Sequence, residues 1–374
     1  MFHSRLMVLS ALMAASVTLA AQGPATLKDA YKGAFYIGVA INSAQITGAD
    51  AAGDAVIAQQ FDSISPENAM KWEVIHPRPD AYNFTLADKY VEFGQKHHMF
   101  IVGHNLCWHA QTPEWVFKDA AGKPLTRDVL LQRLHDHIFT VVGRYKGKID
   151  SWDVVNEALN EDGTLRHSKW FDIIGEDYIV KAFQWAHEAD PKAELNYNDY
   201  NLETPAKRQG AIALIKKIQA AGVPIAVVGS QGHLHMDWPS TEDEEATVTE
   251  LAATGVKVAI TELDIDVLPR VAPNTADVSL NIKADPKLNP YATGLPAEVQ
   301  QALTKRYAGL FAVYLKHRDV MSRVTLWGLS DADSWLNDWP VRGRASYPLL
   351  FDRNNKPKPA FDAVLRVAAH ATKN

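Results

Sequence analysis

The fold is indicated most clearly by the stretch IDSWDVVNE, residues 149–157. Its first seven residues, Ile149–Val155, form a short run with Ile, Trp and Val side chains, as is typical of a strand buried on both faces. The run stops at Asn156 and Glu157, two polar residues that a protein core would reject. Asp153 lies four residues before Glu157, so by the alternation of side chains along a strand it shares the same face at a deeper level.

The same pattern, a short apolar run that ends in polar residues, recurs along the whole chain. The other runs are Phe35–Ile41, Phe61–Ser65, Phe100–Leu106, Ala193–Asn198, Ile225–Val228, Val256–Thr261 and Val324–Leu329. Helical patterns separate the runs, and the clearest one places apolar residues at Leu130, Leu134, Ile138 and Val141. Strands that alternate with helices in this way predict an α/β fold of the (β/α)8 barrel type. A doubly wound open sheet is the alternative, but the sequence contains no GxGxxG or P-loop pattern.

Composition limits the classes of function. The chain has 374 residues, 47% of them hydrophobic, which is enough for one large core. Its formal net charge is −6 without blocks of like charge, whereas a nucleic-acid-binding protein needs a basic stripe, so we expect no nucleic-acid partner. The single cysteine, Cys107, cannot form an intrachain disulfide. Inside an apolar run it is expected to be a small core residue rather than a nucleophile.

The N-terminus has the organisation of a signal peptide. A positive charge within Met1–Arg5 precedes the uncharged apolar run Leu6–Leu19, and small residues follow it. The run is shorter than the ~18–20 apolar residues that span a bilayer, which argues against the alternative of an uncleaved anchor. We therefore expect residues 1–21 to be removed. Residues 22–374 would then form one catalytic barrel domain, secreted or periplasmic, without membrane contact after cleavage.

The polar residues that close the runs indicate the kind of function. In a (β/α)8 barrel the C-terminal ends of the strands meet at one face, so these side chains are expected to share one cleft, together with the long segment Val267–Pro296. Carboxylates, amides, His and Trp predominate. Such a set suits neutral polyhydroxylated rings, because amides and carboxylates bond hydroxyl groups while Trp covers the apolar face of a sugar.

Glu157 and Glu262 are the strongest candidates for catalysis, because each directly closes an apolar run. Glycosidases need two carboxyl groups, one to protonate the leaving oxygen and one to act at the anomeric carbon. Two strand-end glutamates therefore predict a glycosidase. For an arbitrary pair, the alternative is a buried structural ion pair.

His233 and His235 raise a metal-dependent alternative. A His-x-His pair at a barrel strand end can bind a metal, as in amidohydrolases, but such a site needs further His and Asp ligands at other strand ends. The first run offers no such pair, so we expect no metal and no other cofactor. Two other histidines, His135 and His137, are expected on a solvated helix face.

Several segments, taken together, resemble glycoside hydrolase family ten, the retaining endo-1,4-β-xylanases. They are PENAMKW (66–72), GHNLCWH (103–109), WDVVNE (152–157), NDYN (198–201), GSQGH (229–233), ITELD (260–264), WGLSD (327–331), SW (334–335), PLLFD (348–352) and PKPAF (357–361). Their number and order across the chain make the resemblance specific. The sequence departs from the family at Asn105, where Thr is common, and at Cys107, where an aliphatic residue is usual.

The resemblance implies a role for many of these residues. Glu157 would be the general acid/base and Glu262 the nucleophile, while His233 and Asp264 would brace Glu262 and keep it ionised. Asn156 would bond the sugar 2-hydroxyl, an interaction that can strengthen in the transition state. The implied substrate-binding residues are Glu67, Asn68, Lys71, His104, Trp108 and Gln231 on the glycone side, Trp327 and Trp335 as walls of the same subsites, and Tyr200 stacked on the aglycone side.

The activity implied is endo-acting hydrolysis of β-1,4-xylosidic bonds, with xylan and xylo-oligosaccharides as partners and the chain as a monomer. One alternative is a retaining barrel glycosidase that acts on β-1,4-glucan. Glucose carries a C5 hydroxymethyl group that xylose lacks, and Trp327 or Trp335 could exclude it. Another alternative is a non-catalytic carbohydrate-binding barrel, which would lose one catalytic glutamate, whereas this chain keeps both.

Overall fold

Eight parallel strands close into a barrel within the residues that the computed structural model describes, 26–271 and 276–371. They are β1 (Tyr36–Ile41), β2 (Ser63–Pro66), β3 (Phe100–Trp108), β4 (Ser151–Asn156), β5 (Glu194–Asp199), β6 (Val227–Ser230), β8 (Lys257–Asp266) and β9 (Met321–Leu326). Hydrogen bonds connect β6, β5, β4, β3, β2, β1, β9 and β8 in that order, and pairing of β6 with β8 closes the ring. The predicted (β/α)8 barrel is confirmed. The predicted signal peptide lies outside the described residues.

A short additional strand was not predicted. This strand, β7 (His233–His235), pairs with the end of β8, with His233 opposite Asp264. As a result β8 is longer than the predicted run Val256–Thr261, and Glu262 lies within the strand rather than after it. The pairing of β8 with β6 nevertheless ends at Ile260, so Glu262 still follows the part of β8 that pairs with β6. Three residues are too few to give a periodic signal in the sequence.

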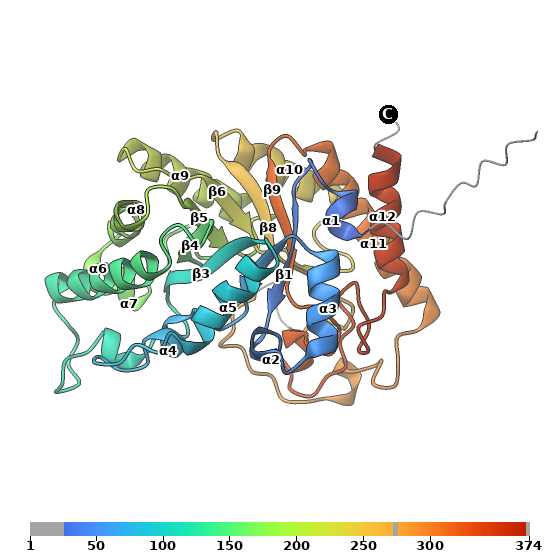
Figure 1. Cartoon of the computed structure of the whole chain (residues 1–374), viewed down its shortest axis with the longest axis horizontal. Helices are drawn as coiled ribbons and strands as arrows, with labels where there is room; N and C mark the ends of the chain where they lie inside the picture. The colour runs from blue at the N-terminus through green and yellow to red at the C-terminus, as the bar shows by residue number, and fades with distance from the viewer. Residues whose placement is uncertain (1–25, 272–275, 372–374) are drawn as a thin grey trace, which may run out of the picture.

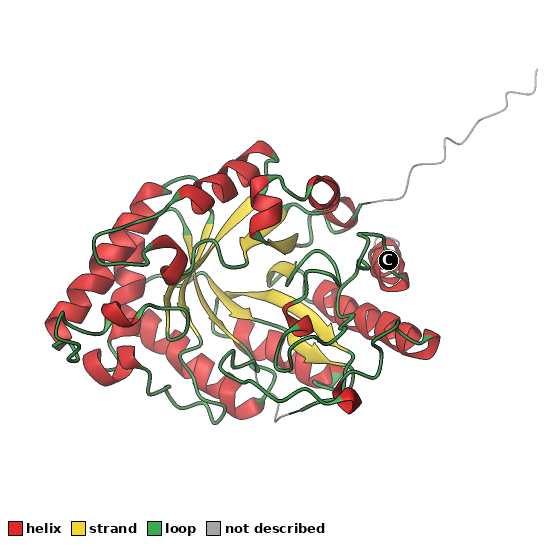
Figure 2. Cartoon of the chain, turned by 90° about the horizontal axis from the view of Figure 1, so that it is seen from below, coloured by secondary structure: helices red, strands yellow, loops and turns green. Residues whose placement is uncertain are grey.

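Helices form a ring around the strands, as Figure 2 shows in the view turned by 90° from Figure 1. They are α1 (Leu27–Ala30), α2 (Ser43–Thr47), α3 (Ala51–Gln60), α4 (Trp72–Ile75), α5 (Thr85–Lys96), α6 (Arg127–Arg144), α7 (Lys169–Ile174), α8 (Tyr178–Ala189), α9 (Pro205–Ala220), α10 (Thr241–Ala252), α11 (Ala297–Lys316) and α12 (Pro359–Ala371). Among the described residues, no helix is long and apolar enough to cross a membrane.

Helix α6 shows how sequence spacing becomes packing. Its four predicted inward residues, from Leu130 to Val141, are all buried, as their helical repeat requires. Cys107 on β3 is buried and carries no disulfide, which confirms that it is a core residue.

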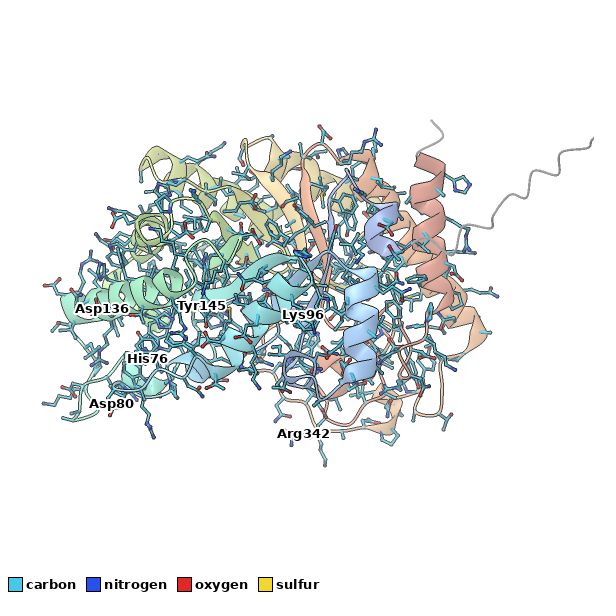
Figure 3. The ribbon with its side chains drawn as sticks, in the orientation of Figure 1. His76, Asp80, Lys96, Asp136, Tyr145 and Arg342 are labelled. Carbon is cyan, nitrogen blue, oxygen red and sulfur yellow. The ribbon has the colours of Figure 1, made fainter. Side chains whose placement is uncertain are left out.

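The prediction for His137 is wrong. His137 is 1% exposed and its ring stacks on Trp72 with a centroid separation of 3.6 Å. His76, labelled in Figure 3, stacks on Tyr82 in the same aromatic cluster. Because α4 covers this face of α6, a position that would face solvent on an isolated helix lies in the interior here. His135 bonds the exposed Asp136 and remains partly exposed.

We expect Gly103→Ala to destabilise the barrel by about 3 kcal/mol, because an added Cβ would lie 2.2 Å from Cε3 of the buried Trp152 on the neighbouring strand. Gly309→Ala in α11 is the control. No atom lies within 4 Å of its added Cβ, and alanine is the better helix former, so that variant should be as stable as the parent or more stable. Urea unfolding followed by circular dichroism measures both changes. Equal stabilities of the two variants would contradict the packing argument.

Candidate active site

A cavity of about 220 Å³ lies at the C-terminal ends of the barrel strands. Its lining residues are Glu67, Asn68, Lys71, His104, Trp108, Gln111, Asn156, Glu157, Gln231, His233, Glu262, Ala276, Val278, Trp327 and Trp335. The closed barrel thus brings together polar residues that are nearly 270 positions apart in the sequence. Ala276 and Val278 belong to the long segment after β8, which was expected on this face.

Glu157 is held by neutral hydrogen-bond donors. It follows β4 directly and is 4% exposed. Its Oε2 accepts from Trp108 Nε1 at 2.8 Å, and its Oε1 accepts from Gln231 Nε2 at 3.0 Å. Burial raises the pKa of the Glu157 carboxyl, the charge of Glu262 raises it further, and the two hydrogen bonds oppose the shift without cancelling it. A carboxyl group in this environment is suited to carry and donate a proton.

Glu262 has the opposite environment. Its Oε1 accepts from Asn198 Nδ2 at 2.8 Å, and its Oε2 lies 3.2 Å from His233 Nε2. Burial by itself would raise the pKa of Glu262. The hydrogen bond from His233 and the charges of His104 and His233, with a contribution from Asn198, together outweigh burial, so the pKa of Glu262 lies below its ordinary value. This group is therefore suited to remain an anion.

His233 carries the positive charge that stabilises this anion. Its Nδ1 lies 3.1 Å from Asp264 Oδ1, on the side of the ring away from Glu262. Burial would lower the pKa of His233, but Asp264 and Glu262 together raise it to about 10. Asp264 lies behind His233 rather than on the cavity wall, and its Oδ2 accepts from Trp335 Nε1 at 2.7 Å. The series of contacts from Glu262 through His233 to Asp264 therefore also fixes the position of Trp335.

Two amide side chains connect the carboxyl groups. Asn198 Nδ2, which donates to Glu262, also donates to Asn156 Oδ1 at 3.0 Å. Asn156 Nδ2 in turn lies 3.4 Å from Glu157 Oε1. Thr261 Oγ1 donates to Asn198 Oδ1 at 2.6 Å and fixes the orientation of that amide. No role was predicted for Asn198, although it closes the fifth apolar run and the rule that selected the glutamates applies to it equally.

Lys71 is a buried cation among the residues that line the cavity. Its Nζ donates to Asn68 Oδ1 at 2.9 Å and to Gln111 Oε1 at 2.7 Å, and it lies 5.0 Å from the centre of the Trp108 ring. Burial lowers its pKa, while the charges of Glu262 and Glu67 oppose that shift. Gln111 was missed by the sequence analysis, although it lies two residues beyond GHNLCWH.

Two of the predicted binding residues, His104 and Tyr200, make hydrogen bonds to other protein side chains. His104 lines the cavity, and its Nδ1 bonds the buried Asp153 at 2.9 Å. Tyr200 is not among the lining residues. It is 2% exposed, its hydroxyl accepts from Arg166 at 2.8 Å, and Lys207 Nζ lies 3.5 Å from the ring centre. Its stacking on an aglycone sugar stays a prediction.

The described part of the chain contains no group of three or more His, Cys, Asp or Glu side chains arranged to hold a metal ion. His233, one half of the His-x-His pair, directs its two ring nitrogens at Glu262 and Asp264. Both nitrogens of this ring are therefore engaged by carboxylate groups.

Comparison with known proteins gives consistent similarities. Residues 26–367 match the model of glycosyl hydrolase family 10. The chain is 44% identical to endo-1,4-β-xylanase A of Xylanibacter ruminicola, covering 95% of this chain and 97% of the relative. It is 43% identical to a β-1,4-xylanase of Dictyoglomus thermophilum, covering 91% and 90%. The structure of an endoxylanase of the same family from a sugarcane soil metagenome superimposes with a TM-score of 0.89 at 51% identity, covering 91% of this chain and 99% of that one.

We expect the contribution of His233 to stability to fall as pH rises. Its pKa of about 10 in the folded chain exceeds the ordinary value of about 6.5, so the folded state binds the proton more tightly. The stabilisation is therefore complete below pH ~6.5 and is lost as pH rises through about 10. Relative to the parent, His233→Gln should lose at least about 1 kcal/mol more stability at pH 6 than at pH 10 in urea unfolding.

His135→Gln, on the partly exposed face of α6, is the matched control for the loss of a histidine away from the cavity, and the pH-dependent loss in His233→Gln should exceed the loss in this control. A loss in His233→Gln that is the same at both pH values would rule out a protonated His233 in the folded chain.

Proposed function

The chain belongs to glycosyl hydrolase family 10, and we propose that it hydrolyses internal β-1,4-xylosidic bonds of xylan with retention of anomeric configuration. The observation that carries the proposal is the pair of buried carboxyl groups whose pKa values are shifted in opposite directions, up for Glu157 and down for Glu262. A retaining glycosidase needs one group of each kind. Relatives named endo-1,4-β-xylanases, and a related structure in complex with xylotriose at 37% identity, support xylan as the substrate.

The proposed reaction has two displacements. In the first, Glu262 attacks the anomeric carbon while Glu157 gives its proton to the glycosidic oxygen, and the aglycone leaves. The covalent intermediate removes the charge of Glu262, and with it one of the causes that raise the pKa of Glu157. Glu157 then accepts a proton from the water that attacks the same carbon, and Glu262 leaves as an anion. Asn156, which contacts Glu157 and is linked to Glu262 through Asn198, would bond the sugar 2-hydroxyl.

The aromatic wall formed by Trp327 and Trp335 supports the proposal that the substrate contains xylose rather than glucose. Trp335 is fixed by its bond to Asp264, and it stacks on Trp339 with a centroid separation of 4.3 Å. Trp327 approaches His104 and His233 edge-on on the same wall. Side chains held this way cannot easily move aside for a C5 hydroxymethyl group. Because both glutamates have environments suited to catalysis, the binding-only alternative has no observation in its favour.

We also propose that the chain is exported after removal of residues 1–21, and that it acts as a monomer. The charged start, the short apolar run and the small residues after it support export. N-terminal sequencing of protein collected outside producing cells tests cleavage, and light scattering of the same sample tests the monomer. An intact N-terminus on the collected protein would contradict the first proposal.

We expect Glu157→Gln to lower kcat/KM at least about hundredfold on a phenyl β-xylobioside, whose poor leaving group needs protonation. The loss should be at least tenfold smaller on the 2,4-dinitrophenyl glycoside, which leaves without a proton. Glu262→Gln should lose activity on both substrates, because it removes the nucleophile. Glu188→Gln on the exposed surface of α8 is the control and should match the parent. Equal losses on the two substrates in Glu157→Gln would count against the acid role.

We expect soluble β-1,4-xylan to yield short oligosaccharides whose first-formed anomers are β, as followed by proton NMR during the first minutes of hydrolysis. Carboxymethyl-cellulose under the same conditions should be cleaved far more slowly. First-formed α-anomers would exclude retention, and faster cleavage of the cellulose derivative would assign the site to glucan instead.

A further inference from the structure

The backbone at Glu157 has an unusual conformation. Its φ is 57°, in the left-handed region that residues with a Cβ rarely adopt. Such a conformation persists where the surrounding structure holds it in place, and it is often found at functional sites. Because the backbone angles set the direction of the Cα–Cβ bond, the contacts that hold this turn also determine where the carboxyl group points.

Three successive backbone amides of the turn, from Glu157 to Leu159, donate hydrogen bonds to groups on strand β5. Glu157 N donates to the carbonyl of Asn198 at 2.9 Å, as in an ordinary ladder. The next two amides bond side chains instead of backbone. Ala158 N donates to the hydroxyl of Tyr197 at 3.2 Å, and Leu159 N donates to Asp199 Oδ2 at 3.3 Å. Hydrogen bonds from β5 therefore continue to constrain the backbone at residues 158 and 159, after β4 has ended.

Asp199 is itself fixed by a buried charge. The Tyr197 hydroxyl donates to its Oδ2, while Oδ1 accepts from Tyr200 N at 2.9 Å and lies 3.0 Å from Lys207 Nζ. Lys207 comes from α9 and is 0% exposed. Its Nζ also reaches Glu161, in the loop that follows the turn, at 3.2 Å. The carboxylate that holds Leu159 thus cannot reorient without uncovering a buried cation.

Arg166 holds the other side of the same turn. Its Nε donates to the carbonyl of Glu157 at 3.1 Å, and its Nη2 donates to the carbonyl of Leu159 at 3.3 Å. The backbone amides of the turn thus bond β5, and its carbonyls at Glu157 and Leu159 bond Arg166, so the turn is constrained from two directions. Tyr197, Asp199 and Lys207 are not among the cavity-lining residues.

We propose that Tyr197 and Asp199 are positioning residues for the general acid, which hold the left-handed turn at Glu157 and so aim its carboxyl group at the glycosidic oxygen. This inference rests on the proposed double displacement. A merely structural role would weaken the fold without distinguishing between steps of the reaction. A positioning role affects proton donation selectively, since a small misplacement of a reacting group can cost a large factor in rate.

Tyr197→Phe is the direct test, because it removes the acceptor for Ala158 N and keeps the ring. We expect kcat/KM on the phenyl β-xylobioside to fall at least about tenfold, while kcat/KM on the 2,4-dinitrophenyl glycoside falls less than about twofold. Tyr314→Phe is the matched control: Tyr314 is also 0% exposed and its hydroxyl also donates to a buried carboxyl group, Glu244. It should show no dependence on the leaving group. Thermal unfolding verifies that the variants are folded.

Equal losses on both substrates in Tyr197→Phe would overturn the proposal, as would a leaving-group effect of the same size in Tyr314→Phe. If Tyr197→Phe does not fold, Asp199→Asn takes its place. With the amide oxygen directed at Tyr200 N and Lys207, its NH2 group faces Leu159 N and cannot accept the hydrogen bond from the turn, so the same leaving-group dependence is expected. Its absence there would overturn the proposal equally. Failure of the parent enzyme on both glycosides and on xylan would instead refute the proposed function.

Discussion

Two ionised carboxyl groups buried in one cavity repel each other and lose their hydration, so each needs its own hydrogen-bonding partners to set whether it is protonated. The hydrogen bonds to one of them come from neutral donors, whereas the other accepts from a cation. Glu157 faces the indole of Trp108 and the amide of Gln231, whereas Glu262 faces His233, whose own charge is balanced by Asp264. The proposed division into acid and nucleophile follows from this asymmetry, because both residues are glutamates with the same intrinsic chemistry.

This arrangement needs a closed barrel. The groups that act on the two glutamates come from β3, β5, β7, β8 and the chain after β6, elements that lie between residues 100 and 266. The amide of Asn198 reaches both Asn156 and Glu262 because β5 lies between β4 and β6, and β6 in turn pairs with β8. An open sheet would place β4 and β8 at a distance that a single amide could not bridge.

Stability and function share the same contacts in several places. The pair formed by His233 and Asp264 holds Trp335 as well as Glu262, so an aromatic wall of the cavity and the charge of the proposed nucleophile are fixed together. In the same way, the buried ion pair of Lys207 and Asp199 lies beneath the turn that carries Glu157. Removing one partner of a buried ion pair is costly, but replacing the whole pair by apolar residues often leaves the stability unchanged. The presence of such pairs next to both glutamates is therefore better explained by the orientation that they impose.

The sequence by itself determined the barrel and the candidate catalytic pair. Short apolar runs and helical repeats are local properties, and the polar residues that close the runs must meet wherever parallel strands end together, which brings Glu157 and Glu262 into one cavity. Only the tertiary structure decided what depends on neighbours distant in the sequence. Four features result from one element packing against another. They are the cover that α4 gives to His137, the strand formed by His233–His235, the bridging role of Asn198 and the burial of Tyr200. Periodicity specifies which face of an element is apolar, but not which partner covers the opposite face or which polar group meets which.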